Sequence, residues 1–193
     1  AMSIDINQLD LTDRKTLFAS LPKGLAIAEI GVAHGEFSAH ILAAAEPSVL
    51  FLIHPYRHQE PEAVGHDPSN AEQPAQDAIY AQVCARFAGC RNVFIKRQFS
   101  LDASWMFYDG ELDVCYLDGN HLQVATDITA WWPKVQSGGI LSGHDYCDVG
   151  DYIGVKSVVD AWAEREGLPI LVTGKNSPDI YERNYPSFLV RKP

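Results

Sequence analysis

The amino-acid sequence predicts an α/β fold, a mainly parallel sheet with helices on both faces. Short apolar runs, each suited to a strand buried on both faces, alternate with stretches of helical periodicity. Such repetition gives a doubly wound sheet with right-handed crossovers. No helical stretch precedes the last apolar run, so its strand is predicted to insert antiparallel to the others.

The predicted strands are apolar runs bounded by glycine or polar residues. Their ranges are 25–30, 49–53, 93–96, 112–117, 139–142, 168–172 and 188–190.

Apolar residues three or four positions apart predict the helices between these strands. The four stripes are Phe37, Ile41 and Ala45; Ile79, Val83 and Phe87; Leu122, Ala125, Ile128 and Trp132; and Val155, Val158, Val159 and Trp162. Ser100 is predicted to cap a further short helix that stops at Gly110. Residues 174–186 are rich in turn formers and are predicted to form a loop or hairpin.

Length and composition predict one domain, residues 1–193, with neither a nucleic-acid nor a membrane partner. The net charge of −10 offers no basic face for phosphates. No apolar run approaches the roughly 20 residues that span a bilayer, and no charged-then-apolar segment marks the N-terminus. The four cysteines form no C-x-x-C pair, so we expect a cytoplasmic protein with reduced thiols. The oligomeric state is left open, with a homodimer as one option.

One connection stands apart by its composition. Residues 57–76 carry three prolines and many polar residues, and the stretch is too long for a routine connection. We expect a lid or substrate loop here, and a flexible insertion is the alternative.

In open parallel sheets, ligands bind beyond the carboxyl ends of the strands, so residues that follow strand ends are the candidates for chemistry. Glu29, Gly31 and Gly35 surround the first such turn. Glycines let a backbone pass close to a ligand, and the following helix offers unpaired N–H groups. A carboxylate two residues before the first glycine suits the cationic amino-acid end of S-adenosylmethionine. A tight turn without a ligand is the alternative.

The end of the second strand carries an unexpected residue. A ribose-binding site wants Asp or Glu about 20 residues beyond the glycines. This sequence has His54 there. A neutral imidazole accepts one hydrogen bond where a carboxylate accepts two, which predicts weaker cofactor binding.

Two further candidate positions follow the fourth and fifth strands, which are expected to be neighbours. Asp118 and His121 follow the fourth strand, and His144 and Asp145 follow the fifth. Two carboxylates with imidazoles can hold a divalent metal ion or form a general-base unit. Alternatively, the first two residues cap the next helix and the other two form a hydrogen-bond network within a loop.

At these positions the chain resembles the class I S-adenosylmethionine-dependent methyltransferases, most closely their small bacterial branch. The resemblance runs from about residue 26 to 162 and rests on residues 29–38 (EIGVAHGEFS), 116–121 (YLDGNH) and 143–146 (GHDY). It implies a Rossmann-like, seven-stranded sheet in the order 3-2-1-4-5-7-6, with strand 7 antiparallel.

The resemblance also implies the residues of the site. The expected cofactor contacts are Glu29, Gly31, Val32, Gly35, His54, Ser100, Leu101 and Asp118. Metal-dependent relatives imply a divalent ion such as Mg²⁺ held by Asp118, His144 and Asp145. Some relatives have a second acid at the position of His144, and some have an Asp base at the position of Asn120.

The expected function is S-adenosylmethionine-dependent methyl transfer to a hydroxyl of a small molecule or sugar. The expected catalytic residues are Asp118, His121, His144 and Asp145. A histidine, or a metal ion held by the two acids, would deprotonate the hydroxyl. Family members commonly carry Asp at the position of His54, which leaves a catalytically degenerate binding protein as the main alternative. A nicotinamide-dependent oxidoreductase is a further alternative, disfavoured by the glycine spacing.

Overall fold

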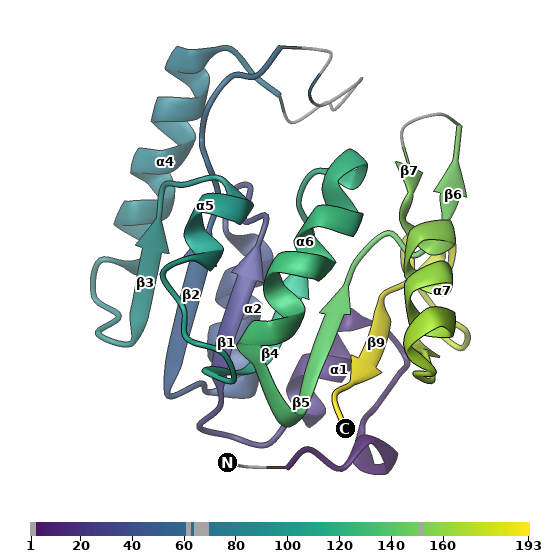
Figure 1. Cartoon of the computed structure of the whole chain (residues 1–193). Coiled ribbons are helices and arrows are strands. Elements are labelled where there is room, and N and C mark those ends of the chain that lie inside the picture. Colours follow the sequence, from purple (N-terminus) through teal and green to yellow (C-terminus); the bar gives the residue numbers. More distant parts are fainter. Residues whose placement is uncertain (1–2, 61–62, 64–69, 151–152) are drawn as a thin grey trace.

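The structure, a computed structural model, describes residues 3–60, 63, 70–150 and 153–193. Its centre is a seven-stranded sheet in the order β3-β2-β1-β4-β5-β9-β8 (Figure 1). Strands β1 to β5 pair in parallel, whereas β9 pairs antiparallel with both β5 and β8. Numbered in chain order within this sheet, the order is 3-2-1-4-5-7-6 with the seventh strand antiparallel, so the predicted fold is confirmed.

The bounds of most strands match the apolar runs of the sequence. The sheet contains β1 (Ala26–Ile30), β2 (Val49–Ile53), β3 (Val93–Lys96), β4 (Leu112–Leu117), β5 (Val135–Gly143), β8 (Leu171–Val172) and β9 (Phe188–Arg191). A separate ladder pairs β6 (Asp148–Val149) with β7 (Ile153–Gly154). The helices are α1 (Arg14–Ser20), α2 (Glu36–Ala45), α4 (Gln73–Phe87), α5 (Ser100–Ser104), α6 (Val124–Trp131), α7 (Val155–Glu166) and α8 (Ile180–Asn184). The 3₁₀ turns of the described residues are η1 (Ile6–Gln8), η2 (His121–Gln123) and η3 (Trp132–Lys134).

Helices cover both faces of the sheet, with α5, α6 and α7 in front and α1 and α2 behind in Figure 1. Because side chains alternate along a strand, each buried strand contributes to two cores. Ile27 and Val114 pack on the face of α1, α2 and α4, whereas Ala28 and Cys115 pack on the face of α5, α6 and α7. Within the described residues, no helix is long and apolar enough to cross a membrane.

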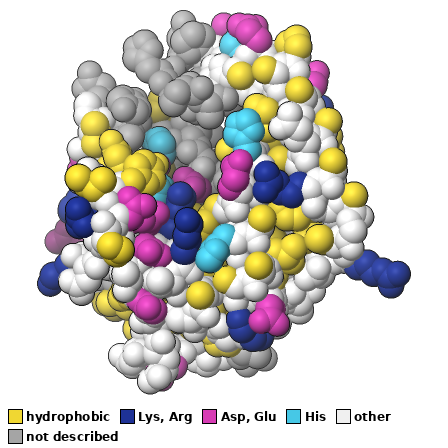
Figure 2. Space-filling view, turned by 180° about the vertical axis from the view of Figure 1, so that it is seen from behind, with side chains coloured by type: hydrophobic (Ala, Val, Ile, Leu, Met, Phe, Trp, Pro, Cys, Tyr) yellow, Lys and Arg dark blue, Asp and Glu magenta, His cyan; other side chains and the backbone are white. Residues whose placement is uncertain are grey.

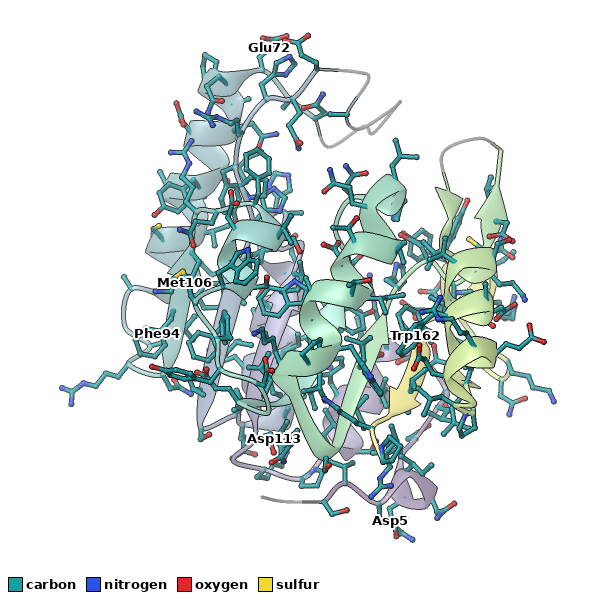
Figure 3. All side chains as sticks on the ribbon, in the orientation of Figure 1. Asp5, Glu72, Phe94, Met106, Asp113 and Trp162 are labelled. Carbon is teal, nitrogen blue, oxygen red and sulfur yellow. The ribbon has the colours of Figure 1, made fainter. Side chains whose placement is uncertain are left out.

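The two edges of the sheet differ in what they hold. The carboxyl ends of the parallel strands form the upper edge in Figure 1. Strand β1 lies between β2 and β4. From β1 the chain continues to β2 and β3 on one side, and later to β4 and β5 on the other, so the strand order reverses at β1. Such a reversal opens a crevice at this edge. At the opposite edge, Asp113 (labelled in Figure 3) accepts a hydrogen bond from the backbone N–H of Ala26 at 2.7 Å. This bond anchors β1 to β4 away from the crevice.

Strand β5 is longer than the sequence suggested, because it begins at Val135 rather than at residue 139. The predicted strand starts at Gly139, directly after another glycine, Gly138. In the structure Gly138 has a φ of 79°, and the β4–β5 register shifts between Leu112 and Val114. The glycines therefore mark an irregularity inside the strand.

The predicted stripe of α6 is right at Ile128, but its other three positions are exposed or only partly buried. Leu122 precedes the helix and is 49% exposed. The buried face consists instead of Val124, Asp127, Ile128 and Trp131. A carboxylic acid occupies one of these inward positions, and an apolar pattern cannot reveal it.

Two predictions about short helices also fail. Ser100 does not cap α5, since the N-cap residue is Phe99 and the serine hydroxyl bonds to Asp127 instead. The helix ends at Ser104, well before Gly110. Residues 174–186 are not only loop, because they contain α8.

Candidate functional site

A pocket lies at the carboxyl ends of β1, β2 and β4, where the crevice was expected. It brings together four of the predicted cofactor residues, Gly31, His54, Ser100 and Asp118. Four other predicted contacts are not among its lining residues: Glu29, Val32, Gly35 and Leu101.

The segment predicted to be a lid contributes to the pocket. Within 57–76, residues 61, 62 and 64–69 lie outside the described residues, and 73–76 belong to α4. Four residues of the segment line the pocket: Arg57, Gln59, Asn70 and Gln76. The described part of this segment therefore faces the crevice.

The glycine turn after β1 is packed against the end of β4. Gly31 has a φ of 96°, and a Cβ atom there would lie 1.9 Å from the carbonyl oxygen of Asp118. The backbone N–H of Asp118 donates to the carbonyl of Ile30 at 2.7 Å, which holds the two strand ends together. Only glycine fits this position, whether or not a ligand is bound.

Glu29 is a buried acid beneath this turn. It is 1% exposed, and the hydroxyl of Ser38 on α2 donates to its carboxylate. Burial raises the pKa of Glu29 to about 8, although the bond from Ser38 works in the opposite direction. The carboxyl group therefore holds a proton at neutral pH in the free protein.

His54 is built into the glycine turn. Its Nδ1 accepts a hydrogen bond from the backbone N–H of Val32 at 3.3 Å. A neutral imidazole that accepts at one nitrogen carries its proton on the other, so this bond assigns the proton to Nε2. The ring also packs against Tyr56, at 4.3 Å between centroids, and the Tyr56 hydroxyl donates to the Ala33 carbonyl at 3.2 Å. A carboxylate at this position would accept hydrogen bonds, whereas the Nε2 atom of His54 is a hydrogen-bond donor.

Asp127 is a pocket residue that sequence reasoning missed. It is 3% exposed on α6, and the Ser100 hydroxyl donates to its carboxylate. The indole N–H of Trp131 in turn donates to Ser100 at 2.9 Å. Burial raises the pKa of Asp127 to about 6, partly offset by the bond from Ser100. The predicted stripe of α6 did not include position 127, so the sequence held no signal for this residue.

The residues predicted to converge after β4 and β5 do so. His121 Nε2 lies 2.8 Å from one oxygen of Asp145, and His144 Nδ1 lies 3.0 Å from the other. Asp118 Oδ1 is 3.8 Å from His144 Nδ1. Burial works to raise the pKa of Asp145, but the bonds from the two histidines prevail and hold the pKa well below its usual range. Histidine, acidic and basic side chains gather in the upper half of the face shown in Figure 2.

The two histidines differ in accessibility. The His144 side chain is 2% exposed and stacks on Tyr181, with 5.8 Å between centroids. Its Nε2 atom has no hydrogen-bond partner within the described residues. The His121 side chain is 29% exposed. Only His121 presents a substantial surface to an incoming molecule.

Arg14, the first residue of α1, was not predicted as a site residue. It contacts the cluster formed by Asp118, His121, His144 and Asp145. Its Nη1 lies 3.3 Å from Asp118 Oδ2, and its Nε lies 3.1 Å from the carboxylate of Glu182 on α8. Burial works to lower the pKa of Arg14, but Tyr116 and the two carboxylates prevail and raise it, so the guanidinium stays charged.

The cluster also permits a test of the expected metal site. One ligand atom each from Asp118, His121 and Asp145 lie within 4.8 Å of one another, so the exposed histidine takes the place expected for His144. However, both oxygens of Asp145 already contact imidazoles, and Asp118 is paired with Arg14. A divalent ion would have to break these contacts, so these residues do not form a ready metal site.

The sheet order and the pocket beside the glycine turn define a Rossmann-like methyltransferase fold. Residues 28–146 match the family model described as "Methyltransferase domain", more than half of the chain. The chain therefore belongs to this family of class I S-adenosylmethionine-dependent methyltransferases. The membership favours the methyltransferase expectation over the nicotinamide-dependent alternative. Among curated proteins, none matches the chain.

Solved structures, among them two that are named as methyltransferases, share the fold at low sequence identity. Precorrin-6y C5,15-methyltransferase from Geobacter metallireducens is 13% identical, covers 100% of this chain and 98% of its own, and gives a TM-score of 0.63. A protein from Corynebacterium glutamicum is 18% identical over 95% of this chain and 83% of its own, with a TM-score of 0.60. The trans-methyltransferase CalH, solved in complex with SAH, is 16% identical over 93% of this chain and 55% of its own, with a TM-score of 0.59. At such identities the likeness shows the fold alone.

Proposed function

We propose that the chain binds S-adenosylmethionine in the pocket beside the glycine turn and transfers its methyl group to a hydroxyl of a small molecule or sugar. The observation that carries this proposal is the pocket itself, which lies at the point where the strand order reverses and contains Gly31, His54 and Ser100. Family membership and the SAH complex of the related fold support the choice of cofactor.

The proposed cofactor contacts divide into three groups. The turn residues Glu29, Gly31, Val32 and Gly35 would hold the amino-acid end, where a cationic ammonium group favours the ionised form of Glu29. His54 would donate from Nε2 to a ribose hydroxyl oxygen, since Nδ1 is already bonded to Val32. The remaining contacts would lie near the adenine: Ser100, Leu101 and Asp118.

The polarity of His54 can be tested by substitution. His54→Asn can keep an acceptor for the Val32 N–H but loses the donor at Nε2, and we expect S-adenosylhomocysteine to bind about 5–10-fold more weakly. His54→Gln reaches the Nε2 position and serves as the matched control with a smaller loss. Equal affinities of the Asn variant and wild type, measured by calorimetry, would rule out a ribose contact from this side chain.

The reaction would be an in-line displacement in which the cofactor supplies an activated methyl group on a sulfonium ion. The acceptor oxygen bonds to the methyl carbon, the carbon–sulfur bond breaks, and its electron pair stays on sulfur. We assign the general base to His121, because it is the accessible histidine of the cluster. Asp145 contacts its Nε2 at 2.8 Å, which keeps a proton on that nitrogen and makes Nδ1 the basic atom that takes the hydroxyl proton.

His144 and Asp118 would act through their neighbours. The His144 ring is buried and bonded to the oxygen of Asp145 that His121 does not use, so it would fix the orientation of that carboxylate. Asp118 lines both the cofactor pocket and the cluster, and so would lie between cofactor and acceptor.

Turnover with labelled S-adenosylmethionine and a panel of hydroxyl acceptors tests this assignment. We expect His121→Gln and Asp145→Asn to lower kcat by about 10²–10⁴-fold with unchanged affinity for S-adenosylhomocysteine. His40→Gln is a control on α2, where the imidazole contacts a backbone carbonyl and stacks on Phe37 outside the cluster. Full activity of both His121→Gln and Asp145→Asn would refute the assignment of the general base, but it would not affect the proposal that the pocket binds the cofactor.

Two further features belong to the proposal. Residues 57–76 would act as a substrate loop, supported by the four described residues of the segment that line the pocket. Protection of this segment from proteolysis by S-adenosylhomocysteine is expected, and equal cleavage with and without ligand would count against it.

Residues 1–193 would form one domain, which predicts a single cooperative unfolding transition.

A further inference from the structure

Contacts with several elements of the fold fix the position of Arg14. Asp13 caps α1 through the backbone N–H of Thr16, so the helix start is fixed. The backbone N–H of Arg14 donates to Glu182 on α8 at 3.3 Å, and its guanidinium carbon lies 4.7 Å above the ring of Phe37 on α2. Its side chain is 20% exposed. The guanidinium therefore has little freedom to leave the cluster.

The contacts of this guanidinium are those of a bound cation. It pairs with Asp118 at 3.3 Å through one nitrogen and with Glu182 at 3.1 Å through another. Arginine cannot lose its charge under ordinary conditions and presents donors in a rigid plane, so it is a permanent partner for two carboxylates.

The remaining oxygens near Asp118 leave little room for a second cation. Asp145 is occupied on both oxygens by His121 and His144. Hard divalent ions such as Mg²⁺ prefer several oxygen ligands in nearly ideal geometry. Both acids of the site are already paired: Asp118 with Arg14, and Asp145 with two imidazoles.

We propose that Arg14 is a built-in cation that takes the place of a divalent metal ion at Asp118, so that the site works without a metal. Arg14 is thus a positioning residue that holds the Asp118 carboxylate between the cofactor pocket and the His121–Asp145 pair. The inference deepens the proposed methyl transfer at the same site, but its test needs neither the cofactor nor the acceptor.

Titration with Mn²⁺, followed by the electron paramagnetic resonance signal of the free ion, tests the proposal directly. We expect no binding by wild type, whereas Arg14→Met, which keeps an apolar stem but removes the charge, gains one site with a Kd of about 1 mM or tighter. Arg14→Lys, the matched control, keeps the charge and is expected to behave as wild type. The gained site should disappear in Arg14→Met combined with Asp118→Asn.

Stoichiometric Mn²⁺ binding by wild type, lost in Asp118→Asn, would overturn the proposal. Absence of binding in Arg14→Met as well would also overturn it, since the arginine would then occupy no cation site. If Arg14→Met does not fold, wild type and Arg14→Lys decide the matter, because binding by either one refutes the proposal and binding by neither supports it. Calorimetry with S-adenosylhomocysteine on wild type, run in parallel, reports separately on the proposed function.

Discussion

The stability of the free protein should depend on pH through Glu29. Burial raises the pKa of this carboxyl group from 4.5 to about 8, so the folded state binds a proton that the unfolded state releases. The contribution of Glu29 to stability is therefore largest below pH 4.5 and falls as the pH rises toward 8. At about 1.4 kcal/mol per pH unit, ionisation of this group costs roughly 5 kcal/mol once the pH exceeds both values.

Glu29→Gln removes this dependence, because an amide keeps the shape and a donor but does not ionise. Relative to wild type, we expect the variant to gain about 3 kcal/mol in free energy of unfolding between pH 5.5 and pH 8.5. Urea unfolding at the two pH values measures this difference. Glu36→Gln, seven residues further along the chain, carries the same substitution on an exposed side chain and should show no comparable gain. Parallel pH profiles of Glu29→Gln and wild type would refute a protonated Glu29.

Three other predictions follow from the pocket. Gly31→Ala should destabilise the fold by more than about 3 kcal/mol in thermal unfolding, because its Cβ atom would lie 1.9 Å from a backbone carbonyl oxygen. The control Gly24→Ala, with a φ of 79° but nothing within 4 Å of the added Cβ atom, should cost only about 1–2 kcal/mol. Equal costs of the two substitutions would contradict the packing argument. Ser100→Ala leaves Asp127 and an indole N–H without their shared partner and should cost about 1–3 kcal/mol by urea unfolding, so an unchanged stability would speak against this network. Binding of S-adenosylhomocysteine at pH 7 should release a proton from Glu29, seen as binding heats that differ between phosphate and Tris buffers; identical heats would exclude this linkage.

Much of the fold could be predicted because its strands are buried on both faces. Such strands appear as apolar runs, and β2, β3 and β4 have the same bounds in the structure as in the sequence analysis. The convergence of His121 and Asp145 could be predicted for the same reason, since parallel neighbouring strands end at one edge.

Contacts between distant parts of the chain could not be predicted. Arg14 meets Asp118 and Glu182, which follow it by 104 and 168 residues, and no local pattern marks such a partner. Helix α8, which supplies Glu182, lies in a stretch rich in turn formers and is only five residues long. Asp127 occupies an inward position of α6 because the Ser100 hydroxyl on α5 donates to its carboxylate, and the Trp131 indole N–H donates to that serine. This arrangement is visible only in three dimensions.

The most direct test of the account is calorimetric titration of wild type and His54→Asp with S-adenosylhomocysteine. We expect stoichiometric binding by wild type with a micromolar Kd, because the histidine serves as a ribose donor in the pocket. Binding by the Asp variant alone would point to a methyltransferase fold that has lost its cofactor. Absence of binding by both proteins would contradict the claim that this pocket holds S-adenosylmethionine.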